Sequence, residues 1–326
     1  MRNETPSQIN FTVVVPTYNG AKRLPQVLDH LQSQTHTEQV TWEVVVVDNN
    51  STDETAKVVQ QYQQSWRNDV PLRYVFERQQ GLAYARQCGI DAAHGELIGF
   101  LDDDNWPSAD WVAQAKAFSD RYPKAGSYGG MIAGVFETQP EQELQPLLRF
   151  LAIRNHGKTE KAFDPQKMQF PPGAGLVVRK TAWQSAVPLQ LLCVTRGGDD
   201  YEISMRMARQ GWEIWYNPAM SIQHFIPAKR LTRNYLRRLA HFYGLCTCKL
   251  ITIDIPYWKQ PALLLKSFLG SCKRITSHYL RYRLDSRKTA EADCMLAFHY
   301  GNLKSPFFYL ATMLGLAKFR PAKLET

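Results

Sequence analysis

The sequence lacks several patterns that would place it in a common protein class. Its six cysteines include no CxxC pair and no zinc-ligand spacing. No stretch reaches the roughly 18 uninterrupted apolar residues of a membrane-spanning helix, and the first residues contain no apolar signal-peptide core. We therefore expect a cytoplasmic protein with reduced thiols that is neither secreted nor integral to a membrane.

Two nucleotide-binding signatures are also missing. A dinucleotide-dependent oxidoreductase would carry GxGxxG after its first strand, and a P-loop NTPase would carry GxxxxGK[ST]. The stretch after the first predicted strand, VPTYNG at 15–20, matches neither pattern. Both classes of nucleotide-binding protein are therefore disfavoured.

Acidic residues are scarce in the last third of the chain. Residues 226–326 contain 18 Lys and Arg against 5 Asp and Glu, whereas residues 1–225 carry a small net negative charge. This asymmetry predicts two regions with different roles, with a boundary near residue 225. A basic region suits nucleic acid, anionic lipid or an acidic substrate, and charge alone does not choose among them.

The first 105 residues alternate between strand and helix patterns. Continuous apolar runs predict strands at 11–15, 42–47, 72–76 and 97–101, and helical spacing or capping signals predict helices between them, including a capping box at Ser51–Glu54. Such strands are typical of a mostly parallel sheet covered by helices. The fold class is therefore α/β, followed after residue 225 by a mainly helical basic extension.

Polar residues follow the predicted strands, where ligands bind in parallel sheets. The sharpest cluster is Asp102–Asp104, because three adjacent carboxylates repel one another unless a cation offsets their charge. Oxygen ligands favour Mn²⁺ or Mg²⁺, which commonly bridges substrate phosphates. A solvated acidic turn is the alternative interpretation.

Five segments in this order resemble the motifs of family 2 glycosyltransferases, inverting enzymes with the Rossmann-like GT-A fold. They are 13–20 (VVVPTYNG), 47–53 (VDNNSTD), 81–89 (with Ala85, Arg86 and Gly89), 100–105 (FLDDDN) and 198–206 (GDDYEISMR). The resemblance covers roughly residues 9–227 and assigns residues 1–225 to a nucleotide-sugar glycosyltransferase domain. Residues 226–326 form a basic amphipathic region in this interpretation.

The resemblance implies a set of donor and metal residues. The metal ligands would be Asp104, Asp102 and His224. The donor would contact Pro16, Thr17, Tyr18, Asn19, Asp48, Asn50, Arg86, Asp102 and Asp103. Arg86 on a surface helix and His224 as a structural histidine are alternatives.

The resemblance also implies catalytic and acceptor residues. Asp200, or its neighbour Asp199, would take the proton of the acceptor hydroxyl, although both acids could instead cap the following helix. The acceptor would contact Gly173, Ala174, Gly175 and Trp215, while core packing is the alternative for the tryptophan.

The resemblance thus predicts a metal-dependent, hexosyltransferase-like enzyme that moves a sugar, by default from UDP, to a hydroxyl in bacterial polysaccharide or glycolipid synthesis. We expect Arg230–Leu250, Tyr257–Leu269 and Pro306–Phe319 to lie on an anionic membrane, peripheral to the inner face of the plasma membrane. Packing on the first domain is the alternative, and nucleic acid has no supporting motif. A non-catalytic, membrane-associated protein that binds nucleotide sugar or glycan is the alternative function.

Overall fold

The computed structural model describes residues 9–189, 191, 198–283 and 289–316, and these form two compact units. The first unit comprises the described residues of 1–135, 153–194 and 203–225. The second comprises those of 136–152, 195–202 and 226–326. Residues 317–319 of the predicted segment Pro306–Phe319 lie outside the described part.

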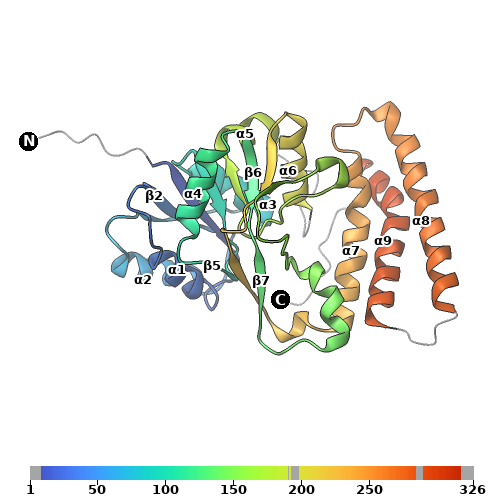
Figure 1. The fold of residues 1–326 in the computed structure, drawn as a ribbon, viewed down its shortest axis with the longest axis horizontal. Coiled ribbons are helices and arrows are strands. Elements are labelled where there is room, and N and C mark those ends of the chain that lie inside the picture. Colours follow the sequence, from blue (N-terminus) through green and yellow to red (C-terminus); the bar gives the residue numbers. More distant parts are fainter. Residues whose placement is uncertain (1–8, 190, 192–197, 284–288, 317–326) are drawn as a thin grey trace, which may run out of the picture. The chain divides into compact units, whose positions relative to one another are not determined.

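An eight-stranded, mostly parallel sheet organises the first unit (Figure 1). Its order is β3-β2-β1-β4-β9-β6-β10-β8, with β9 antiparallel to β4 and β6, and β8 antiparallel to β10. The strands are β1 Phe11–Thr17, β2 Trp42–Asp48, β3 Leu72–Phe76, β4 Leu97–Phe100, β6 Ala125–Gly129, β8 Lys161–Ala162, β9 Val177–Arg179 and β10 Glu213–Tyr216.

The central strands lie where the sequence predicts them because they are buried along their whole length. All seven residues of β1 and of β2 are buried, and Val44–Val47 have no exposed surface. A parallel strand covered on both faces needs an uninterrupted apolar run rather than alternation. The order β3-β2-β1-β4 runs parallel throughout.

Helices follow the strands in the first unit. The helix α1 buries Leu24, Val27, Leu28 and Leu31, which recur at helical spacing. The helices are α1 Leu24–Gln32, α2 Thr55–Ser65, α3 Leu82–Ala92, α4 Trp111–Arg121, α5 Lys180–Ala186, the short 3₁₀ turn η2 Pro165–Lys167, and α6 Asp199–Arg209, whose first turn belongs to the second unit.

Two predicted boundaries are wrong. Strand β1 continues through Pro16 to Thr17, because Pro16 lies beyond the last residue of β1 that pairs with β4. The capping box at Ser51 does not form, since the Ser51 hydroxyl instead accepts a hydrogen bond from the Asn19 N–H at 2.9 Å. Helix α2 begins at Thr55 without a side-chain cap bond.

A second, three-stranded sheet includes the strand that comes directly after the acidic residues. Its order is β5-β11-β7, with β5 Asn105–Pro107, β11 Ile222–Ile226 and β7 Ile132–Phe136. Strand β11 is antiparallel to β5 and places His224 opposite Asn105. The histidine is thereby held beside the turn that comes after β4.

The second unit is helical. Its elements are η1 Gln142–Leu151, η3 Ala228–Arg230, α7 Arg233–Ile251, η4 Tyr257–Lys259, α8 Gln260–Arg283 and α9 Ala290–Met313. Helix α9 packs against both α7 and α8 (Figure 1). Among the described residues, no helix is long and apolar enough to cross a membrane.

Candidate active site

Polar side chains converge beyond the carboxyl ends of β1, β2 and β4. Thr17 ends β1 and pairs with Asp48 at the end of β2. The Leu101 N–H donates to the Val14 carbonyl at 3.0 Å, which holds the start of the acidic turn against β1. The strands therefore bring together the donor and metal residues that the sequence predicts at this edge.

Asp103 faces the loop that comes after β1. Its carboxylate accepts hydrogen bonds from the Thr17 hydroxyl at 2.7 Å and from the Arg23 Nε at 2.8 Å and Nη2 at 2.9 Å. Arg23 also donates to the Tyr18 carbonyl at 3.2 Å. The Asp103 carboxylate thus ties the acidic turn to the loop, and both of its oxygens are engaged within the protein.

Asp102 lies next to Arg86, with 3.7 Å between Oδ1 and Nη2. The Arg86 side chain is buried and lies over the ring of Phe100. Burial raises the pKa of Asp102 to about 6, with Arg86 opposing the rise and the carboxylate of Asp104 adding to it. A cation at this turn would favour the ionised form.

Asp104 and His224 form the pair that best suits a metal ion. Asp104 Oδ2 lies 3.6 Å from His224 Nε2, and both side chains are nearly buried. The Asp104 carbonyl accepts from the Phe225 N–H at 2.9 Å, and its carboxylate accepts from the Asn105 amide at 3.1 Å. The bond from Phe225 fixes the acidic turn to β11.

No ready-made metal cage exists among the described residues, since no three His, Cys, Asp or Glu side chains are grouped for one. Mg²⁺ typically binds through one or two carboxylates, with waters and substrate phosphates completing its shell. Two ligand atoms each about 2.1 Å from one ion, at a right angle, lie about 3 Å apart. The separation of 3.6 Å between Asp104 and His224 therefore fits a shared ion after a small side-chain adjustment.

Asp48 is buried and already has two hydrogen-bond donors. Its oxygens accept from the Ser51 N–H at 2.9 Å and from the Tyr74 hydroxyl at 2.8 Å. Burial and this bond to Asp48 raise the pKa of Tyr74, so the phenol stays protonated. A carboxylate offers about four acceptor positions, so Asp48 keeps capacity for a ligand hydroxyl or N–H.

Two loops carry the remaining predicted donor residues, and they are bonded to each other. The Asn19 side chain accepts from the Thr52 N–H at 2.8 Å. Asn19 and Asn50 both adopt positive φ, at 47° and 65°, which asparagine tolerates better than most residues. Pro16 is buried near the end of β1, whereas Tyr18 and Asn50 are exposed in the loops.

The predicted acceptor glycines lie against other parts of the first unit. A Cβ on Gly173 would come within 2.3 Å of Arg86 Nη2, so this glycine makes room for the guanidinium. Gly175 has φ 69° and donates to the Phe100 carbonyl at 3.0 Å, and Ala174 between them is buried. The segment 173–175 thus supports the Arg86 side of the acidic turn.

Trp215 is surrounded by aromatic rings. Its ring lies 4.3 Å from that of Tyr122 and 6.0 Å from that of Phe118 between centroids, and its indole N–H donates to Glu213. The side chain is partly buried against the core of the first unit. These contacts give Trp215 a packing role, which the sequence offered as the alternative to acceptor binding.

Asp199 and Asp200 begin helix α6 and belong to the second unit. Asp199 is buried and Asp200 partly so. The Asp200 carboxylate accepts from the Tyr201 N–H at 2.9 Å. Both acids lie in the first helical turn, where negative charge is favourable.

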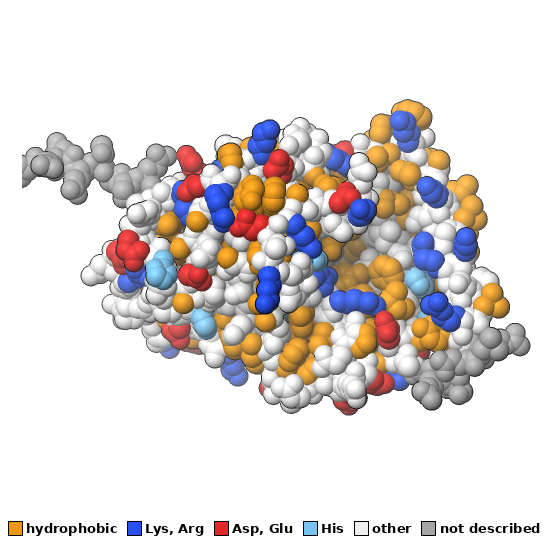
Figure 2. Space-filling view, viewed as in Figure 1, with side chains coloured by type: hydrophobic (Ala, Val, Ile, Leu, Met, Phe, Trp, Pro, Cys, Tyr) orange, Lys and Arg blue, Asp and Glu red, His pale blue; other side chains and the backbone are white. Residues whose placement is uncertain are grey.

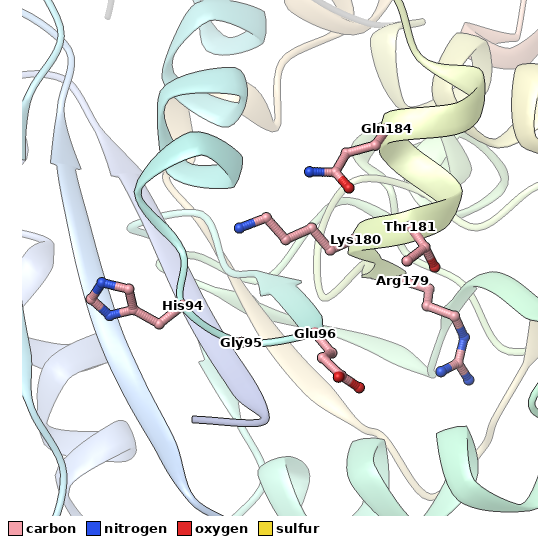
Figure 3. Close-up of a pocket in the computed structure, with 7 residues that line it drawn as sticks. All are labelled: His94, Gly95, Glu96, Arg179, Lys180, Thr181 and Gln184. Atoms are coloured by element: carbon pink, nitrogen blue, oxygen red, sulfur yellow. The ribbon is translucent and has the colours of Figure 1, made fainter. Parts of the chain in front are cut away.

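A separate cavity of about 220 Å³ lies at the other end of β4 (Figure 3). It is formed by the segment before β4 and the start of α5, where the Lys180 ammonium donates to the Ala93 carbonyl at 2.6 Å. The lining residues are His94, Gly95, Glu96, Arg179, Lys180, Thr181 and Gln184. None of the predicted site residues lines this cavity.

Three contributors to the site were missed by the sequence reasoning. Arg23 and Tyr74 act through long-range side-chain contacts that no local pattern signals. The sequence could have indicated Asn49, because this residue lies within the motif segment 47–53. Its amide accepts from the Gly81 N–H at 2.6 Å and donates to the Gln79 carbonyl at 2.7 Å, which joins the end of β2 to the start of α3.

The mostly parallel sheet of the first unit belongs to a fold that solved glycosyltransferase structures share. The model of glycosyl transferase family 2 matches residues 12–184, and the chain belongs to this family. The family prediction is confirmed.

Curated relatives match parts of the chain. Glycosyltransferase AglE of Haloferax volcanii is 35% identical over 101 residues, 31% of this chain and 32% of AglE. Dolichyl-phosphate beta-glucosyltransferase ALG5A of Trichomonas vaginalis is 30% identical over 156 residues, 46% of this chain and 47% of that protein. Poly(ribitol-phosphate) beta-N-acetylglucosaminyltransferase TarS of Staphylococcus aureus is 33% identical over 116 residues, 35% of this chain and 19% of TarS. The matched part therefore spans less than half of each relative.

Solved structures match nearly the whole chain. The mannosyltransferase PcManGT from Pyrobaculum calidifontis, in complex with GDP-Man and Mn²⁺, has a TM-score of 0.58 at 20% identity, covering 94% of this chain and 86% of PcManGT. TarS 1–349 of S. aureus has a TM-score of 0.50 at 17% identity, covering 97% and 94%. At these identities the similarity confirms the predicted GT-A fold.

Proposed function

We propose that this protein is an inverting, metal-dependent glycosyltransferase that moves a sugar from a nucleotide sugar to an acceptor hydroxyl. The observation that carries the proposal is the pairing of Asp104 with His224, 3.6 Å apart, beside Asp102 and Arg86 at the carboxyl edge of the sheet. Ligands bind at this edge in open α/β sheets.

The nucleoside of the donor binds, in this proposal, at the ends of β1 and β2. Asp48 has unused acceptor capacity toward a base or ribose, and Thr17 pairs with it. The other proposed contacts are Pro16, Tyr18, Asn19 and Asn50. UDP is the expected nucleotide. The TarS 1–349 complex with UDP-GlcNAc and the PcManGT complex with GDP-Man carry nucleotide sugars on this fold, so both nucleotides require testing.

The diphosphate lies, in this proposal, over Asp102, Asp104 and His224. Mn²⁺ or Mg²⁺ bound there would offset the charge that develops on the leaving diphosphate. Arg86 holds Asp102 in place from a buried position supported by Gly173. Asp103 acts on the loop of Thr17 rather than on the donor, because Arg23 and Thr17 occupy its oxygens.

The transfer is a single in-line displacement. The acceptor oxygen forms a bond to the anomeric carbon as the bond from that carbon to the diphosphate oxygen breaks, and the electron pair leaves with the diphosphate. The Asp200 carboxylate takes the hydroxyl proton, with Asp199 as the alternative base. One displacement inverts the anomeric configuration.

The acceptor is proposed to be a glycan or a lipid-linked molecule in polysaccharide or glycolipid synthesis. The relatives named dolichyl-phosphate beta-glucosyltransferase and poly(ribitol-phosphate) beta-N-acetylglucosaminyltransferase support this acceptor class. The catalytic domain is residues 1–225, and the basic region 226–326 places it at the anionic inner face of the plasma membrane.

The test is a calorimetric titration of UDP-, GDP- and dTDP-sugars into the full-length protein, with and without Mn²⁺. We expect saturable binding of one nucleotide class that requires Mn²⁺ and is lost in Asp104→Ala. Asp120→Ala removes an exposed carboxylate on α4 and is the matched control, which should bind like the wild type.

Each outcome discriminates between the candidate functions. Mn²⁺-dependent binding followed by sugar release to an acceptor supports the enzyme. Binding without any turnover favours the non-catalytic binding protein. Absence of binding by the folded protein, or equal binding by Asp104→Ala, removes the proposed donor site.

A further inference from the structure

Helix α9 exposes some of its large apolar side chains. Its buried positions are mostly small or polar, and they include Gly301, Asn302 and Ser305. Phe307 and Leu310 are 62% and 46% exposed. A helix at the centre of a water-soluble bundle normally buries its large apolar residues, so the exposure of Phe307 and Leu310 is unusual.

Close backbone contact and polar bonds hold α9 to α7. A Cβ on Gly301 would come within 2.1 Å of the His241 carbonyl, and one on Gly244 within 2.3 Å of the Phe298 carbonyl. Nearby, the Ser305 hydroxyl donates to the Leu245 carbonyl at 2.7 Å. Small residues and polar bonds at the contact are typical of helices that pack where apolar surface is not driven inward by water.

Helix α8 and the turn η4 continue the same pattern. Leu264 is the only large aliphatic or aromatic residue of α8 that is fully buried among its described side chains. Trp258, Leu265 and Leu269 are 77%, 59% and 57% exposed.

Several exposed apolar residues of the two helices and η4 lie at one end of the unit, and Tyr279 and Leu280 are also exposed near the other end of α8. The Tyr309 hydroxyl of α9 donates to the Gln260 side chain at the start of α8, at 2.8 Å. The rings of Phe268 and Phe307 lie 5.7 Å apart. The start of α8 and the end of α9 are therefore neighbours, and we call their exposed residues Trp258, Leu265, Leu269, Phe307 and Leu310 the apolar end.

Basic side chains predominate beside the apolar end, although Asp254 before η4 is also exposed. Residues 255–283 contain six Lys and Arg and no Asp or Glu. Lys266 and Lys273 are exposed on α8 between its outward leucines. Figure 2 shows hydrophobic and basic side chains next to one another over this helix. Exposed apolar and basic groups together match the interface of an anionic bilayer, where the rings and leucines enter the acyl boundary and the lysines meet headgroups.

We propose that the apolar end, rather than α7, is the surface by which this protein inserts into the interface of an anionic membrane. Helix α7 buries Leu236 and Leu239, so these apolar side chains are already covered. The proposal rests on the proposed function only in that it explains how the enzyme reaches a membrane-borne acceptor.

The test is vesicle flotation of the full-length protein with two lipid mixtures, phosphatidylcholine alone and phosphatidylcholine with phosphatidylglycerol. We expect flotation with the anionic vesicles that weakens at high salt, because screening reduces the attraction of the lysines. The double variant Trp258→Ser/Leu265→Ser should bind at least about tenfold more weakly, since two large apolar groups no longer leave water. Leu189→Ser, which removes an exposed leucine of the first unit, should bind like the wild type.

Variants with reversed charge test whether the exposed lysines contribute to binding. Lys266→Glu/Lys273→Glu should abolish the preference for anionic vesicles, whereas Lys57→Glu on α2, also exposed, should keep it. Nucleotide-sugar binding is measured on every variant. Loss of flotation with intact nucleotide binding supports the membrane surface independently of the catalytic proposal.

Three results would overturn the proposal. They are absence of flotation by the wild type, unchanged flotation of the Trp258→Ser/Leu265→Ser protein, and a concentration-dependent dimer that this variant dissociates without any vesicle binding. The last result would assign the apolar end to self-association.

Discussion

Arg23 and Asp103 form a bidentate ion pair that joins the loop after β1 to the acidic turn after β4, with 2.8 and 2.9 Å between their paired atoms. The same carboxylate accepts from Thr17. Hydrogen bonding to Asp103 raises the pKa of Arg23, so the pair stays charged. A planar guanidinium fixes both partners more firmly than a lysine would.

Arg23→Ala should destabilise the protein and should also loosen the loop after β1. Asp103 is nearly buried and would lose its counter-charge, so we expect a loss of about 1–2 kcal/mol in the free energy of unfolding, less than for a fully buried pair because Arg23 is partly exposed. The KM for the donor should rise more than kcat falls. Urea unfolding and steady-state kinetics measure both.

The matched control for Arg23 is Lys116→Ala, which breaks the exposed pair with Asp120 on α4 and should change stability by less than about 0.5 kcal/mol. Arg23→Lys should restore only part of the loss. Additive effects of Arg23→Ala and Asp103→Ala in a double-mutant cycle would contradict the coupling.

The carboxylate of Glu43 should make stability depend on pH. Burial opposes its ionisation, but hydrogen bonds from the His94 N–H, Arg73 and Thr12 outweigh this and lower its pKa. The folded protein therefore keeps Glu43 ionised to lower pH than the unfolded chain, whose glutamates titrate near about 4.3. The stabilisation is present above that pH and is lost as pH falls through the folded pKa.

Glu43→Gln should therefore cost about 2–4 kcal/mol at neutral pH and progressively less below about pH 4. Urea unfolding from pH 3 to 7 follows the difference between the two proteins. Glu54→Gln removes an exposed carboxylate and serves as the control. A difference that stays constant across this range would show that Glu43 acts through shape rather than charge.

A few residues show which features the sequence could predict and which it could not. The run Val44–Val47 predicted β2 because a covered parallel strand has no polar face, and Asp102–Asp104 marked the edge because polar residues directly after a buried strand lie at the sheet edge. The capping box failed because Ser51 had a second partner, the N–H of Asn19, 32 residues earlier in the chain. Local patterns carry no information about such a competitor.

Long-range contacts also explain why Arg23 was missed and why the surroundings of the basic region could not be predicted. Arg23 bonds to a residue 80 positions away, and only the folded sheet brings them together. Helical periodicity predicted α7, yet it could not tell whether the apolar stripe faces lipid or other helices. The structure buries Leu236 of α7 and leaves Leu265 of α8 exposed.

The contact between α7 and α9 predicts opposite effects for one substitution at two glycines. Gly301→Ala would place a methyl group within 2.1 Å of the His241 carbonyl, and we expect a loss of at least about 2 kcal/mol. Gly270→Ala on α8 would meet only the end of the Arg274 side chain at 3.3 Å. Because alanine favours helix, this change should stabilise by about 0.5–1 kcal/mol.

Urea unfolding followed by the helical circular dichroism signal measures both glycine variants. A loss of equal size at Gly270 would mean that the substitution acts through the helix backbone generally. It would then say nothing about the contact between α7 and α9.

Substitution of the two acids at the start of α6 can distinguish a catalytic role from a helix-capping role. Asp200→Asn keeps the size of the side chain and removes its charge, so transfer should fall about 10²–10⁴-fold while donor affinity stays unchanged. If Asp199 is the base, Asp199→Asn shows that loss instead. Should both acids serve only the helix, each variant would keep its transfer rate and lose about 0.3–1 kcal/mol of stability. Transfer rate, donor affinity and unfolding free energy, measured on the same two proteins, distinguish these cases because only a catalytic base changes the first and spares the second.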